Sequence, residues 1–151
     1  MDHHAIPQQV LNEHQTLAFV ISALRSTIGW KYQGADLTRK LASLQFVGQS
    51  FQRHLKHLMA LEEEDGYMSV VLASRPELSD EVTALRAEHD EFRRTLNRIL
   101  NRLRRIEPTD HATFTTVSDE FLAMLEKLDQ HSRRETDLLQ EALLTDEGGE
   151  G

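Results

Sequence analysis

Residues 82–106, VTALRAEHDEFRRTLNRILNRLRRI, carry the most regular helical pattern in the chain. One face recurs every three or four residues, the spacing that aligns side chains along one side of an α-helix. Its members are Val82, Leu85, His89, Phe92, Leu96, Ile99, Leu103 and Ile106. All are apolar except His89, so the segment predicts a long amphipathic helix with one ionisable group on its inner face.

Three further segments show the same period, so four helices are expected in all. They span about residues 8–29, 36–64 and 79–106, and from Thr109 or Asp110 to about residue 144. Glycines or prolines separate these segments, and Asp36, Ser79 and Asp110 are suited to cap the helices that follow. Four long helices with short connections predict an all-α, antiparallel, up-down-up-down four-helix bundle.

Length and composition fit one domain. The chain has 151 residues, a common size for a single domain, and we expect that domain to span residues 1–144. The last residues, 145–151, read TDEGGEG and predict a disordered acidic tail.

The charge and composition exclude several function classes. A net charge of -8 disfavours nucleic acid and acidic membrane surfaces as partners. The absence of cysteine excludes disulfides and thiolate metal sites. The start, MDHHAIPQQV, does not resemble a signal peptide, and no apolar stretch approaches the roughly 20 residues of a membrane span. We therefore expect a cytoplasmic protein.

Ionisable residues interrupt the inner faces of all four helices. They are His14 in the first helix, His54 and Glu62 in the second, His89 in the third, and His131 and Glu135 in the fourth, with His57 and Glu63 on the flank of the second. Counting from the connecting loops at about 1.5 Å per residue places these positions in one slab of the bundle. His131 and Glu135 are four residues apart and therefore share one helix face.

Several buried carboxylates and imidazoles at one depth need a common partner, because an isolated buried charge is costly. A cation is such a partner, and mixed imidazole and carboxylate ligands suit iron, manganese or zinc. The pattern therefore predicts a metal site in the core of the bundle.

The order of these residues resembles the hemerythrin family, specifically its HHE cation-binding domains. The resemblance covers about Gln8 to Leu144 and rests on His14 in NEHQTL, His54 or His57 ahead of EEEDGYM, His89 in AEHDEF, and His131 with Glu135 in HSRRE. It implies a four-helix bundle with a non-haem di-iron centre. It also implies that His14, His89, His131 and Glu135 are iron ligands, with Glu135 bridging two ions.

The sequence departs from the family pattern in two places. The family offers a histidine and a glutamate four residues apart on the second helix, whereas Glu62 comes five residues after His57. A π-bulge would bring these two residues together; otherwise His54 and Glu62 would serve from different turns. Classical hemerythrins carry two histidines on the third helix, four residues apart, and Arg93 takes the second place here. Two irons, a single metal ion or another divalent ion therefore all remain open.

The resemblance implies a protein that binds or senses oxygen or a related small diatomic such as nitric oxide, or that handles iron or redox stress. Such roles favour a binding protein over an enzyme. A ferritin-like oxidase ranks lower, because such sites use Glu-x-x-His motifs and the chain contains none. A metal-free helical interaction module is the remaining alternative.

Overall fold

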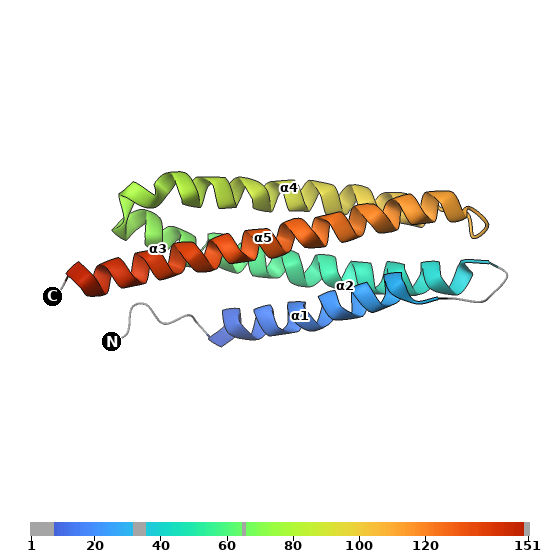
Figure 1. Cartoon of the computed structure of the whole chain (residues 1–151), viewed down its shortest axis with the longest axis horizontal. Helices are drawn as coiled ribbons and strands as arrows, with labels where there is room; N and C mark the ends of the chain where they lie inside the picture. Colours follow the sequence, from blue (N-terminus) through green and yellow to red (C-terminus); the bar gives the residue numbers. More distant parts are fainter. Residues whose placement is uncertain (1–7, 32–35, 65, 150–151) are drawn as a thin grey trace.

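The computed structural model describes residues 8–31, 36–64 and 66–149, with the backbone alone for 143–149. Its four long helices are α1 (Gln8–Gly29), α2 (Thr38–Glu63), α4 (Ser79–Arg104) and α5 (His111–Gly149). A short helix α3 (Tyr67–Ser74) and a 3₁₀ turn η1 (Pro76–Leu78) connect α2 to α4. The described residues form no strand, so the predicted all-α four-helix bundle is confirmed (Figure 1).

The two long hairpins have their loops at the same end of the bundle (Figure 1). There the Leu37 amide, just before α2, donates a hydrogen bond of 2.9 Å to the Pro108 carbonyl, just before α5. The α3 connection lies at the opposite end, as do both chain ends of the described bundle. This arrangement is the predicted up-down-up-down topology. The backbone of α5 stays helical to Gly149, into the predicted tail, whose residues 150–151 lie outside those described.

Two of the three predicted helix caps are made. The Asp36 carboxylate accepts from the Thr38 amide at 3.0 Å, and the Asp110 carboxylate accepts from the Thr113 amide at 3.0 Å. The predicted Ser79 cap is wrong, because α4 begins with Ser79 itself and no side chain caps it. The η1 turn already gives Ser79 helical angles, φ -61° and ψ -33°, so its side chain is not in a capping position.

The core consists of two apolar clusters with a polar layer between them. The larger cluster fills the loop end and includes Phe51, Leu96 and Phe121. The smaller one lies beside α3 and includes Met68, Leu85 and Leu138. On α4, His89 stands between Phe92 of the first cluster and Leu85 of the second. The predicted slab is found in part, since Glu62, His89, His131 and Glu135 are buried in this interruption of the core.

None of the helices in the described part of the chain combines the length and apolar character required to span a bilayer.

Candidate metal centre

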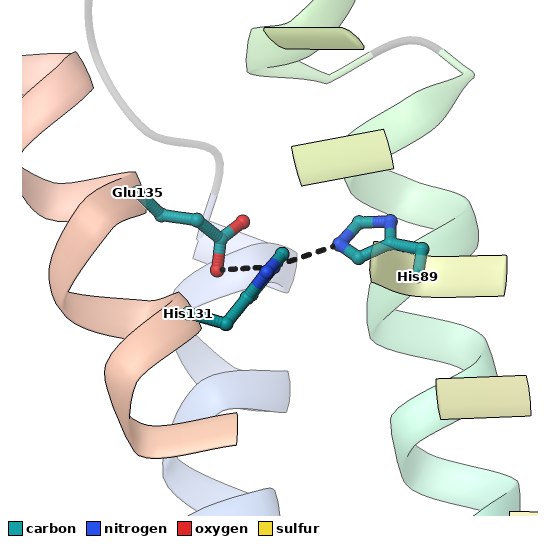
Figure 2. A group of neighbouring side chains, drawn as sticks. All are labelled: His89, His131 and Glu135. Atoms are coloured by element: carbon teal, nitrogen blue, oxygen red, sulfur yellow. Dashed lines mark hydrogen bonds and ion pairs between the residues drawn. The ribbon is translucent and has the colours of Figure 1, made fainter. Parts of the chain in front are cut away.

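Two histidines from neighbouring helices meet at the middle of the polar layer. His89 of α4 and His131 of α5 are 1% and 2% exposed, respectively. Their Nε2 atoms lie 3.1 Å apart, and Figure 2 shows the two rings directed toward each other across the gap between the helices. Phe92 packs edge-on against the His131 ring, with centroids 5.3 Å apart. Both imidazoles are therefore held in the core with the same nitrogen facing inward.

Glu135 joins the two histidines from one turn further along α5 (Figure 2). Its Oε1 lies 3.4 Å from His131 Nε2, and the side chain is buried. One ligand atom from each of His89, His131 and Glu135 lies within 4.8 Å of the others, close enough for one metal ion. The predicted stacking of His131 and Glu135 on one helix face thus produces a shared centre.

Glu62 of α2 lies on the other side of this trio. Its Oε1 is 3.6 Å from His89 Nε2, and its Oε2 is 3.8 Å from Nε2 of His14 on α1. Glu62 is 4% exposed, whereas the His14 side chain is 44% exposed. The two carboxylate oxygens therefore face histidines of different helices, one buried and one at the rim.

Tyr67 is a further member of this layer that the sequence pattern did not predict. Its hydroxyl donates a short hydrogen bond to Oε2 of Glu135. Gly66 makes this possible, because a Cβ at that position would lie 2.2 Å from the Leu61 carbonyl oxygen. The tight return of the chain after α2 brings Tyr67 back over Glu62. A glycine directly before a tyrosine, shortly after a buried acid, is the only sequence signal for this contact.

The pKa values of the two buried carboxyls, Glu62 and Glu135, shift in opposite directions. Burial raises the pKa of Glu62 far above its usual range, and the neighbouring Glu135 carboxylate raises it further. Burial alone would also raise the pKa of Glu135, but hydrogen bonds with His131, Glu62 and Tyr67 lower it. Glu62 is therefore the protonated partner and Glu135 the charged one at neutral pH.

The pKa values of the two buried histidines, His89 and His131, also shift in opposite directions. Burial lowers the pKa of His89, so this imidazole is neutral. Burial opposes charge on His131 as well, but hydrogen bonds to Glu135 and Glu88 raise its pKa above the ordinary value. A hydrogen bond joins Nε2 of His131 to Nε2 of His89. The raised pKa values of Glu62 and His131 favour protons where four potential ligand atoms converge, as expected where a cation would fit.

A cavity of about 200 Å³ adjoins the layer between α1 and α5. Its wall is mostly apolar, with Leu17, Ile21, Leu55, Leu58, Leu125 and Leu128, while Arg25, Asp129 and Ser132 also line it. Leu17, Leu58 and Leu128 line this cavity, whereas Phe51 and Phe92 do not. The cavity gives a small ligand an apolar space beside His14, Glu62, His89, His131 and Glu135.

The family model of the Hemerythrin HHE cation binding domain matches residues 5–143. The chain belongs to the hemerythrin family. No curated protein and no solved structure shows significant similarity to it. The family is described as cation-binding, and the converging imidazoles and carboxylates are the candidate site for such a cation.

This hemerythrin domain does not bring His54 or His57 to the polar layer. His54 Nδ1 lies 2.8 Å from Oε1 of Glu13, and His57 Nδ1 lies 3.2 Å from Oε2 of the same residue. Both histidines therefore face α1 on the flank of α2, outside the cavity lining. The π-bulge that would bring His57 and Glu62 together is absent, since α2 is regular from residue 38 to 63, so these two residues project in different directions.

Glu63, Arg93 and His111 lie outside the centre. Glu63 accepts from Nδ1 of His89 at 2.7 Å, on the side of the ring away from the cluster, so Glu62 alone of the two faces the cavity. Arg93, at the place of a second histidine, forms an ion pair with Glu63. His111 is exposed at the loop end, and His3 and His4 lie outside the described residues.

Proposed function

We propose that this chain is a non-haem iron protein that binds or senses oxygen or a related small diatomic. The observation that carries the proposal is the convergence of Glu62, His89, His131 and Glu135 from three helices beside an apolar cavity. A purely structural bundle gains nothing from four such groups at one depth, because apolar residues there would cost less.

The donor set favours iron. Imidazole and carboxylate without thiolate suit iron, manganese and zinc, and hemerythrin-family domains are typically iron proteins. His89, His131 and Glu135 form a compact group of donors, and Glu62 offers its second oxygen toward His14. We propose that two ions are held. Glu62, whose oxygens face His89 and His14, would contact both ions. The resemblance gives that role to Glu135, but one of its oxygens accepts a hydrogen bond from Tyr67.

Each side chain has a definite task in this proposal. The Tyr67 hydroxyl occupies Oε2 of Glu135 and leaves Oε1 for a metal ion. His89 and His131 present Nε2, and the leucines of the cavity keep bulk water away from these nitrogens. Iron held here would supply an open coordination position for the diatomic ligand. The cavity of about 200 Å³ has room for such a ligand, since a water molecule takes a share of about 30 Å³ in the liquid.

Anaerobic titration of the metal-free protein with Fe(II) tests the proposal. We expect tight binding near two ions per chain, and an absorption change when oxygen or nitric oxide is added. His131→Ala should lose most of the bound iron, whereas His111→Ala, at the far end of the bundle, should bind like the wild type. If the wild-type chain takes up no Fe(II), it is a metal-free helical module instead. Equal iron in both variants would refute the site.

A further inference from the structure

Each central imidazole is also held from its outer side. His89 Nδ1 lies 2.7 Å from Oε2 of Glu63, and Arg93 Nη2 donates to that same oxygen at 2.7 Å. The Glu63 side chain is only 12% exposed, so this contact is sheltered from water. An arginine therefore holds a carboxylate, and the carboxylate holds the ring.

The same arrangement recurs at His131. Its Nδ1 lies 2.9 Å from Oε1 of Glu88, and Arg134 donates a short hydrogen bond to the other oxygen of Glu88. Both histidines thus use Nδ1 for a carboxylate that an arginine fixes, and both direct Nε2 toward the centre. Two independent arginine–glutamate–histidine sets with the same nitrogen on the same side indicate a shared purpose.

The carboxylates also join different helices. Glu63 reaches from α2 to His89 on α4, and Glu88 reaches from α4 to His131 on α5. Each stands next in sequence to a residue of the centre, Glu63 after Glu62 and Glu88 before His89. Neighbouring residues on a helix project about 100° apart, so one can face the core while the next reaches sideways to another helix.

We propose that Glu63 and Glu88 are positioning residues that orient His89 and His131 for metal binding, with Arg93 and Arg134 holding them in place. This inference rests on the proposed iron site. A neutral imidazole carries one ring proton, so a carboxylate on Nδ1 leaves the lone pair of Nε2 for a metal. The carboxylate also makes the imidazole a more basic ligand. Arg93 therefore serves the centre indirectly, at the place where classical hemerythrins have a histidine.

The test compares Glu63→Gln and Glu88→Gln with the wild type in anaerobic Fe(II) titrations against a competing chelator. Each substitution should weaken binding by about 10–100-fold. Glu63→Ala should weaken it more than Glu63→Gln, because the amide oxygen still accepts from Nδ1–H. The matched control is Glu91→Gln, a 55% exposed glutamate on α4 whose nearest cation is Lys127 at 3.8 Å. This control should bind iron like the wild type.

A second readout separates positioning from mere folding. Loss of the carboxylate should raise the reduction potential of bound iron, because a less basic imidazole stabilises Fe(III) less. Thermal unfolding of the metal-free variants shows whether they are folded. If the wild type binds iron while both glutamine variants match its affinity and potential, the positioning role is refuted and the iron site stands. If the wild type binds no iron, both proposals fail.

Discussion

Two layers of this bundle occupy equivalent inner positions of the same helices but have contrasting physical roles. The layer around Phe51 and Phe121 is apolar, and the two rings pack with centroids 6.0 Å apart. The layer around His89 and His131 is equally buried but polar. The first stabilises the fold by removing apolar surface from water, whereas the second takes ionisable groups out of water, which costs free energy. The difference shows that burial alone does not reveal what a core position contributes.

The largest effect on stability should come from the apolar layer. Phe121→Ala removes a fully buried ring and should lower the free energy of unfolding by about 3–5 kcal/mol. Urea unfolding of the metal-free protein measures this. Phe46→Ala, at a side chain that is 75% exposed, should change stability by less than about 0.5 kcal/mol. If Phe121→Ala also lowers the free energy of unfolding by only this small amount, the apolar layer is not the main source of stability.

Replacing a buried carboxyl in the polar layer should raise the free energy of unfolding, rather than lower it. Glu62→Leu replaces a buried carboxyl, 4% exposed, with an apolar side chain. Such replacements of buried ionic groups are often neutral or stabilising by about 1–4 kcal/mol. Metal-free Glu62→Leu should therefore unfold at higher urea than the wild type and bind little metal. Glu64→Leu, on the exposed end of the helix, serves as the control. A loss of stability in Glu62→Leu would show that this layer supports the fold as the apolar one does.

Metal binding should release protons from the polar layer at neutral pH. Burial raises the pKa of Glu62 to about 11, and carboxylate neighbours raise the pKa of His131, so the protonated form of each is favoured in the metal-free protein. A metal ion must displace these protons, and its affinity should therefore rise with pH. Calorimetry in buffers of different ionisation enthalpy counts the protons. Glu62→Gln, which has no proton to lose at that position, should release one fewer; an unchanged count would contradict the protonation of Glu62.

The smallest expected effect is on the pH dependence of stability, at Asp110 at the loop end of the bundle. The side chain and amide of Thr113 donate to Asp110 and lower its pKa below the ordinary 3.8. Because the folded-state pKa is lower than the unfolded one, Asp110 stabilises the fold at higher pH and loses this effect as the pH falls through the folded value. Asp110→Asn should therefore show a shallower fall of Tm in acid than the wild type. Asp119→Asn, exposed on α5, is the control. If the Tm of Asp110→Asn falls with decreasing pH as steeply as that of the wild type, Asp110 does not contribute this stabilisation.

The contrast between the layers also explains where sequence reasoning succeeded. An inner position is set by the period of its own helix, so Phe121, His131 and Glu135 could all be placed on one face of α5 from spacing alone. The outward contacts of His54 and His57 could not be found this way, because they depend on Glu13 of another helix. The Tyr67 contact likewise depends on a chain reversal at Gly66.

The sequence by itself determined four amphipathic helices, their order, and the common depth of Glu62, His89, His131 and Glu135, because these follow from local periodicity and loop positions. Only the tertiary structure decided which atoms meet. Whether Glu62 or Glu63 enters the centre, and which nitrogen of His89 faces it, depends on how α2, α4 and α5 are rotated against one another. That rotation is fixed by packing between helices distant in sequence, which the spacing along a single helix does not encode.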